Sequence, residues 1–290
     1  MIDFDQREGL TVTLNNTGLS SNNPMLAFAG SAVAASLWLV AIIAAPEIQR
    51  SGLSLIVARI VVHLLLLGGA WAGLARTSLT GAERMQTWLA IAVPLTLWHA
   101  SAWVIVANGL LRPGAVPIPL LLLMIVVPAP IAIVLLWRSR RVGALLDAMP
   151  LTWLIGIQFY RVVGATFLVG WASGAVPGAF ALPAGTGDVI TGLAALPVAA
   201  SLASGQPGSA RAALLWNLFG IGDLILAVTL GALTSPGPLQ RLALDHPNLT
   251  NFTYPSAIIP AFTVPSSFVL HALSLRQLLR RARPAAPVVT

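Results

Sequence analysis

The chain contains no cysteine and no lysine, so all 16 of its basic residues are arginines. The lack of cysteine excludes disulfides, thiol redox chemistry, iron–sulfur clusters and cysteine-ligated zinc. The lack of lysine excludes a Schiff-base anchor for retinal or pyridoxal phosphate. Several classes of cofactor enzyme are thereby removed, and we expect no cofactor.

Charged residues are also scarce, at 9% of 290 residues, whereas hydrophobic residues make up 57%. Soluble domains carry about 25% charged residues, so this composition is typical of a multi-pass membrane protein. The mean hydropathy of +0.86 agrees. A net charge of +7 could indicate a nucleic-acid partner in a soluble chain. In a membrane chain we expect the lipid bilayer as partner and no nucleic acid.

Apolar runs of about 20 residues, the length that a helix needs to cross a bilayer, recur along the chain. We therefore predict an all-α fold, a polytopic transmembrane helical bundle with eight spans. The predicted spans are 25–45, 51–74, 87–110, 115–137, 151–173, 178–203, 209–233 and 255–276.

The predicted spans imply three parts of the chain. Residues 1–24 form a polar N-terminal tail, residues 25–276 form a single transmembrane bundle, and residues 277–290 form a basic tail. Residues 150–276 hold most of the polar side chains that fall inside spans, so we expect the polar core of the bundle there.

Arginine placement predicts the orientation of the bundle. With eight spans and an internal N-terminus, 11 arginines fall in inside segments and 3 (Arg50, Arg112 and Arg241) fall in outside loops. Cytoplasmic segments of membrane proteins carry such an excess of arginine. We expect both termini in the cytoplasm and the protein in the bacterial inner (cytoplasmic) membrane.

Two spans contain residues that interrupt helices. Pro128 and Pro130 predict a kink in the fourth span. Pro177 and Pro183, with the glycines around residue 186, predict an unwound or re-entrant start of the sixth span. A short interfacial helix is expected over residues 142–149.

Ionisable residues inside the membrane are costly and therefore face protein, water or each other. Asp188 in the sixth span and Asp223 in the seventh lie on stripes of small residues, which allow close helix approach. Arg161 in the fifth span is the natural counter-ion of these aspartates. His271, Asn217 and Gln158 are further polar candidates for the same interior site.

Two interpretations of this site follow from the residues. In the first, Asp188, Asp223, Arg161 and His271 form a site for transport of a proton, an ion or a small polar solute. In the second, Arg161 and an aspartate form a buried ion pair that fixes helix register in a structural or accessory subunit. Neither requires an enzyme, and the sequence indicates no oligomeric state.

A second polar set lies in the N-terminal half. Arg59 and His63 are four residues apart on one helix face, and His63 and His99 are expected at similar depth in neighbouring spans. Two histidines at one depth could ligate a haem iron or another metal. A haem-binding membrane protein is therefore a further alternative, although packing histidines would give the same pattern.

The motif GxGD occurs twice, as "GTGDVI" from Gly185 and "GIGDLI" from Gly220. It resembles the second active-site motif of intramembrane aspartyl proteases of the presenilin, signal-peptide-peptidase and prepilin-peptidase group. The resemblance implies that Asp188 and Asp223 would be catalytic, with Pro260 opening a Pro-Ala-Phe similar to that group's Pro-Ala-Leu. The chain departs from the group, because Gly187 stands where the presenilin branch has tyrosine and the lysine of the prepilin branch is missing.

Longer stretches of the second half carry another resemblance. They are "QFYRVVGATFL", "PGAFALPAGTGDVITGLAA", "WNLFGIGDLILAVTLGALTS" and "YPSAIIPAFTVPSSFVLHALSL". Over residues 150–276 the chain resembles a group of bacterial multi-pass integral membrane proteins that have no assigned activity. The resemblance implies a class of protein and no chemistry.

Overall fold

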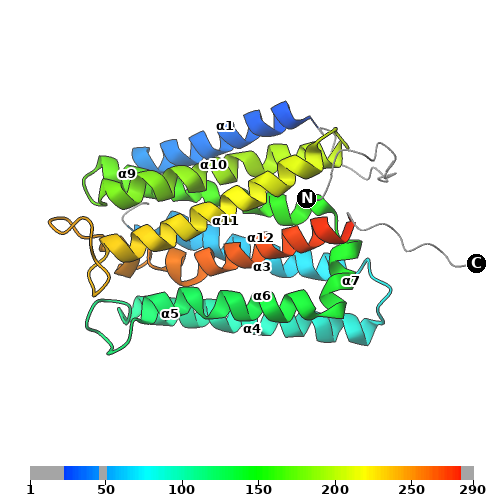
Figure 1. The fold of residues 1–290 in the computed structure, drawn as a ribbon, viewed down its shortest axis with the longest axis horizontal. Helices are drawn as coiled ribbons and strands as arrows, with labels where there is room; N and C mark the ends of the chain where they lie inside the picture. Colours follow the sequence, from blue (N-terminus) through cyan, green and yellow to red (C-terminus); the bar gives the residue numbers. More distant parts are fainter. Residues whose placement is uncertain (1–22, 46–50, 282–290) are drawn as a thin grey trace, which may run out of the picture.

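The computed structural model describes residues 23–45 and 51–281, and all its regular elements there are helices (Figure 1). The predicted all-α fold is confirmed for this part of the chain. Residues 1–22 of the predicted polar tail and residues 282–290 of the predicted basic tail lie outside the described residues.

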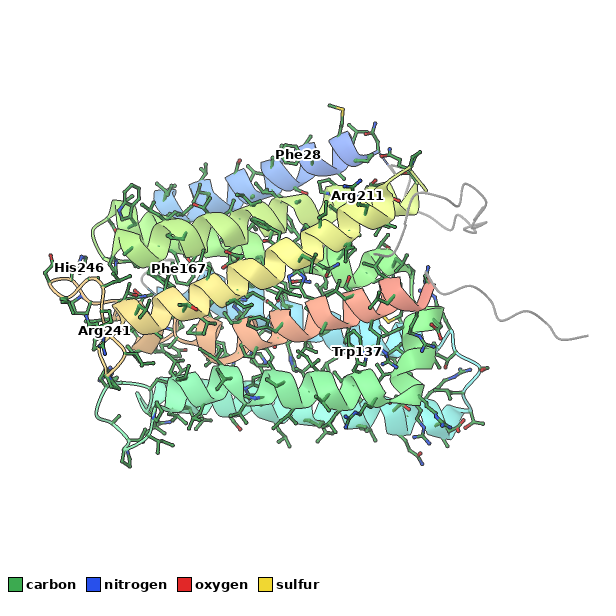
Figure 2. All side chains as sticks on the ribbon, in the orientation of Figure 1. Phe28, Trp137, Phe167, Arg211, Arg241 and His246 are labelled. Carbon is green, nitrogen blue, oxygen red and sulfur yellow. The ribbon has the colours of Figure 1, made fainter. Side chains whose placement is uncertain are left out.

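Seven helical segments of the described chain are long and apolar enough to cross a membrane, which indicates a membrane protein. Figure 2 agrees, since carbon dominates the side chains on the outward faces, while the labelled Arg211 and Arg241 lie toward opposite ends of the bundle. The segments are α1 (Pro24–Ala44), α3 (Leu53–Leu74), α4 (Gly81–Ala107), α5 and α6 together (Leu120–Arg138), α8 to α9 (Leu151–Ala172), α10 (Gly178–Ala203) and α11 (Ser209–Thr234).

The predicted eighth span differs from these seven. A π-helical turn, η3 (Ile259–Thr263), leads into α12 (Val264–Arg281). Three arginines lie in the last six residues of α12, which lowers its hydropathy, and α12 is not among the seven segments. The last helix extends beyond residue 276, the predicted end of the eighth span, and continues through Arg281.

Helix ends follow local hydrogen bonds more closely than hydropathy. The third segment begins at Gly81 rather than the predicted residue 87, because Thr80 and Glu83 form a reciprocal capping box. The backbone N–H of Thr80 donates to Oε2 of Glu83 (2.9 Å), and the N–H of Glu83 donates to Oγ1 of Thr80 (3.3 Å).

The predicted kink of the fourth span is confirmed, since α5 (Leu120–Val126) ends before Pro128 and α6 (Pro128–Arg138) begins at it. The expected short helix is α7 (Arg140–Ala148), capped by Ser139, whose Oγ accepts from the N–H of Val142 at 3.2 Å. In Figure 1, α7 lies across the ends of the longer helices, as an interfacial helix would.

The predicted unwinding of the sixth span is wrong, because α10 is one continuous helix from Gly178 to Ala203. Pro177 sits at the N-cap position, outside the hydrogen-bonded turns, and Pro183 lies near the helix start, where its missing N–H removes one backbone bond. The irregular segment lies one span earlier. There, α8 (Leu151–Gly156) passes into a 3-10 stretch, η1 (Ile157–Gly164), before α9 (Ala165–Ala172).

Helix α10 is the centre of the bundle. It packs against α1, α11 and all three parts of the α8–η1–α9 segment, and α12 packs against α11, α6 and α8. Close approach to η1 depends on Gly192, where a Cβ atom would lie 2.6 Å from the backbone nitrogen of Val162. The fold thus holds η1, α10, α11 and α12 around one interior volume.

Candidate polar site

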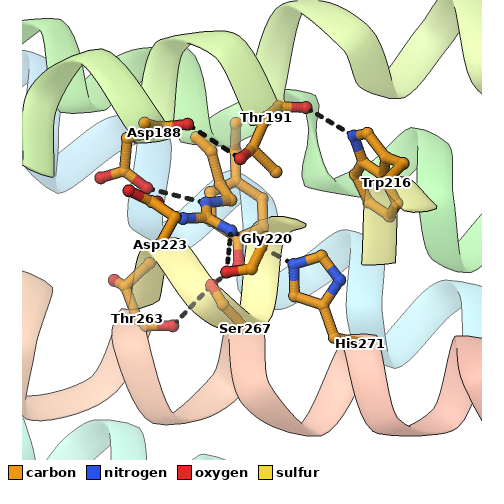
Figure 3. A network of polar contacts seen from close by, with 11 residues as sticks. Asp188, Thr191, Trp216, Gly220, Asp223, Thr263, Ser267 and His271 are labelled. Atoms are coloured by element: carbon orange, nitrogen blue, oxygen red, sulfur yellow. Dashed lines mark hydrogen bonds and ion pairs between the residues drawn. The ribbon is translucent and has the colours of Figure 1, made fainter. Parts of the chain in front are cut away.

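Arg161 is the centre of a buried polar network, and it lies on the 3-10 stretch η1. Its Nε–H donates to Oδ1 of Asp188 on α10 at 2.7 Å, and its Nη2 group donates to Oδ2 of Asp223 on α11. Nη1 faces the carbonyl oxygen of Gly220 (3.3 Å) and Nε2 of His271 on α12 (3.2 Å). The predicted counter-ion therefore bridges both aspartates, and every nitrogen of its guanidinium has a partner (Figure 3).

The histidine in this network is neutral by geometry. A guanidinium has donors only, so Nε2 of His271 must accept from Arg161. The other ring nitrogen, Nδ1, then carries the proton and donates to Oδ1 of Asn217 at 3.0 Å. Asn217 in turn donates through Nδ2 to Oγ of Ser274 (3.1 Å) and to the carbonyl oxygen of Ala213 (2.8 Å). This chain of bonds fixes the ring, its tautomer and one edge of the guanidinium.

Glycines of the two GxGD motifs permit these contacts. A Cβ atom at Gly187 would collide with the carboxylate of Asp223, and one at Gly220 would collide with the ring of His271. At Gly185 it would lie 2.9 Å from the side chain of Leu168, whereas at Gly222 it would meet no atom within 4 Å. Three of the four motif glycines are therefore close-packing positions.

The side chain of Asp188 is more exposed than those of Arg161 and Asp223. Its side chain is 19% exposed, whereas those of Arg161 and Asp223 are 2% and 4% exposed. Asp188 lies in the wall of a cavity of about 490 Å³. The cavity is bounded by the loop between α4 and α5, the start of α5, one face each of α10 and α11, and the loop after α11. Residues of α9, η2, η3 and the start of α12 also line it. The buried ion-paired network thus reaches an open space at one carboxylate.

A much smaller cavity, about 20 Å³, lies on another side of Asp188. Its wall includes Arg59, Tyr160 and Thr263. Nε and Nη1 of Arg59 and Oγ1 of Thr263 are buried and have no protein hydrogen-bond partner. A water molecule needs roughly 10–15 Å³ of such volume and two to four polar partners. The small cavity offers a water molecule enough volume and polar partners on Arg59, Thr263 and Asp188.

Three members of this region were not among the predicted site residues. The hydroxyl of Tyr160 is hydrogen-bonded to Oγ of Ser267 at 2.6 Å, and Ser267 donates to the carbonyl oxygen of Thr263 at 2.9 Å. Thr263 and Ser267 share one helix face with His271 at four-residue spacing, and this polar face was the available signal. Tyr160 had no such signal, because its position depends on the 3-10 turn of η1. Arg59 also belongs here, as its guanidinium lies 5.9 Å from the Tyr160 ring centre.

Gln158 is a predicted site residue that the structure does not bring into the network. Its side chain is fully buried, and neither Oε1 nor Nε2 has a protein partner. The position lies on η1 three residues before Arg161. Such a group is costly when unpaired, and we have no contact that explains it.

His63 and His99 form a packed pair. Their ring centres are 4.6 Å apart, and Phe262 stacks on His99 at 4.3 Å. His63 Nε2 lies 3.1 Å from Oγ1 of Thr96, and Nε2 of His99 accepts from the indole of Trp103 at 2.8 Å. A haem iron ligated by both rings would need to lie between them, and ring centres 4.6 Å apart leave no space for it, so this geometry does not fit a haem. No group of three or more metal-ligating side chains occurs in the part of the chain that the structure describes.

The bridging arginine also bears on the protease alternative. An aspartyl protease requires two carboxylates that share a proton and activate one water molecule. Here Arg161 donates a hydrogen bond to each carboxylate and bridges the two, so no proton is shared directly between them. The structure therefore brings Asp188 and Asp223 together in an arrangement that does not suit acid–base catalysis.

Comparison with known proteins gives one result, a family model that matches residues 118–279 and is described as a domain of unknown function (DUF8737). This match covers more than half of the chain. The chain belongs to the DUF8737 family. The family region contains Arg161, Asp188, Asp223 and His271, and it leaves out Arg59 and His63. No curated protein and no solved structure matches the chain.

Proposed function

We propose that this DUF8737 protein transports a proton, an ion or a small solute, and that Asp188, Asp223 and Arg161 form its binding centre. The observation that carries the proposal is the unequal burial of the network. Asp188 lines the 490 Å³ cavity, while its partner Arg161 is almost completely buried. A purely structural ion pair has no need of an open space beside one carboxylate.

In this proposal Asp188 is the group that meets the transported species. A proton or cation that binds Asp188 neutralises the carboxylate and weakens its bond to Arg161. Arg161 retains Asp223 as partner, so its charge stays compensated during the exchange. His271 and Asn217 hold the far edge of the guanidinium in place while the Asp188 edge changes.

The proposal includes a membrane setting. The seven apolar segments and the η3–α12 segment form eight spans, with both termini cytoplasmic, in the inner membrane of a bacterium. The arginine distribution and the resemblance over residues 150–276 support this orientation and source.

Flux through reconstituted liposomes tests the proposal. Asp188→Asn keeps the shape and one acceptor but removes the charge, and a hydrogen bond to a charged group is worth about 1.5–3 kcal/mol. We expect a fall in proton or cation flux of at least about tenfold. Asp147→Asn, which removes a carboxylate from α7 outside the network, is the matched control and should keep wild-type flux.

A structural lock is the second candidate, because all three nitrogens of the Arg161 guanidinium are bonded within the protein. Thermal unfolding, measured together with flux, distinguishes a structural lock from a transport site. If the network only locks helices, Asp188→Asn should lower the melting temperature and the wild-type protein should carry no flux above that of empty liposomes. Flux by wild type, lost in a variant that still folds, decides for transport.

A further inference from the structure

We propose that the cavity beside Asp188 binds a hydrophobic organic ammonium ion, whose N–H group donates to the Asp188 carboxylate while its apolar part fills the cavity. The inference rests on the proposed transport function, since it names the substrate class of the same site.

The walls of the cavity are apolar, and this argues against a hydrated ion or a sugar-like solute. Leucine, isoleucine, valine, proline and alanine side chains make up most of the lining, and only Arg112 and Asp188 among the described lining residues are charged. A polar solute would lose its hydration there without gaining hydrogen bonds. An apolar group gains from leaving water.

The two charges lie at different ends. Arg112 is exposed in the loop after α4, where water and salt screen its charge. Asp188 lies eight residues beyond Phe180 on the same face of α10, about 12 Å further along the helix axis. The deep end of the cavity is therefore anionic, and its outer end is apolar with a screened cation at the rim.

The Asp188 carboxylate has unused acceptor capacity. An ionised carboxylate offers about four lone-pair sites, and among the described residues Asp188 receives one hydrogen bond, at Oδ1 from Arg161. Its side chain remains 19% exposed. A donor that enters the cavity can therefore bond to Asp188 without displacing Arg161.

Aromatic rings complete the chemistry. Phe167, Phe180 and Phe252 line the cavity, and the first two meet edge to face with their ring centres 5.1 Å apart. Aromatic rings offer large apolar faces to the hydrophobic part of such a ligand. A carboxylate at the end of an apolar space with aromatic walls is a recognition set for an ammonium ion that carries a hydrophobic group.

The test is a calorimetric titration of the full-length protein in detergent with naphthylmethylamine, naphthylmethanol and naphthylacetate as probes, with empty micelles as reference. We expect the amine to bind at least about tenfold more tightly than the alcohol, because only the ammonium group forms an ion-paired hydrogen bond with the Asp188 carboxylate. The acetate should bind most weakly. Equal affinity of amine and alcohol for the wild type would overturn the inference.

Two variants with a matched control complete the test. Asp188→Asn should remove the preference for the amine, and Ala227→Phe, which fills the cavity without touching the ion pairs, should weaken both amine and alcohol. Asp147→Asn should bind as wild type. Unchanged amine binding in both cavity variants would contradict the proposal. Proton or cation flux without amine binding would reject the inference and keep transport, whereas amine binding without any flux would reject transport.

Discussion

Arg161 donates from Nε to Oδ1 of Asp188 across 2.7 Å, and this bond joins a buried cation to a carboxylate that a cavity reaches. The same cation holds the more buried Asp223 through Nη2. Arg161 thus pairs with one carboxylate that is buried inside the protein and with one carboxylate that lines an open cavity. The predictions below follow from this asymmetry and from the glycines and the second arginine around it.

Alanine at Gly187 and alanine at Gly222 should have opposite effects on stability. A methyl group at Gly187 would meet the Asp223 carboxylate, and overpacking of this kind costs about 1–3 kcal/mol. Position 222 is exposed, with no atom within 4 Å of a new Cβ, so alanine there should gain up to about 1 kcal/mol of helix propensity. Thermal unfolding in detergent measures both, and equal effects would show that the motif glycines do not act by close packing.

Substitution of Arg161 should lower stability strongly, and a second substitution at Asp223 should restore part of that stability. Arg161→Met leaves the buried Asp223 without a partner, and removal of one member of a buried pair costs about 3–5 kcal/mol. The double variant Arg161→Met with Asp223→Asn should recover part of that loss, since the uncompensated charge is gone. Unfolding temperatures of the two single variants and the double variant measure this coupling. Strictly additive effects would contradict the ion pair.

Arg59 should be a residue that lowers stability. Two of its buried nitrogens have no partner among the described residues, so only water in the small cavity can satisfy them, and burial of a charge without a paired counter-ion is costly. Arg59→Met keeps the length without the charge, so the melting temperature should rise by a few degrees. A stability loss in this variant would mean that Arg59 has a structural role instead.

The α7–α12 contact should depend on pH. Arg280 donates from Nε to Oδ1 of Asp147 at 2.8 Å, and this bond holds the pKa of Asp147 below its ordinary value of 3.8. A lowered pKa stabilises the fold at pH values above 3.8, and the benefit is lost as the pH falls through the pKa of the folded state. The pair is largely exposed, so its contribution is at most about 1 kcal/mol. The difference in melting temperature between wild type and Asp147→Asn should be small at pH 7 and should shrink as the pH falls below 3.8, and a difference that grows on acidification would contradict the pairing.

Much of the fold was predictable because apolar length and charge placement follow from membrane physics. The ends of α10 and α11 agree with hydropathy within one residue, and the break before Pro128 follows from its missing N–H. The pairing of Arg161 with aspartates on the next two helices was also predictable, since a buried charge requires a partner.

The continuity of α10, the 3-10 turn before α9 and the cavity beside Asp188 could not be predicted, because they depend on backbone geometry that hydropathy does not describe. The sixth span has the proline and glycine pattern of a broken helix, yet it is continuous, because Pro183 lies near the start and the glycines serve packing. The 3-10 turn that places Tyr160 and Arg161 toward the interior has no proline within it. The cavity beside Asp188 is built from loops and helices that lie far apart in the sequence, and no local pattern specifies such a space.

The most direct test of the account is thiol labelling, for which a chain without cysteine is well suited. Ala227 lines the cavity one helical turn beyond Asp223, whereas Ala213 on the same helix is fully buried away from it. We expect Ala227→Cys to react rapidly with a cationic methanethiosulfonate reagent, and we expect naphthylmethylamine to slow this reaction. Ala213→Cys should stay unlabelled. Equal labelling of the two positions, or no labelling of Ala227→Cys in folded protein, would contradict the claim that the Asp188 site is open to an external ligand.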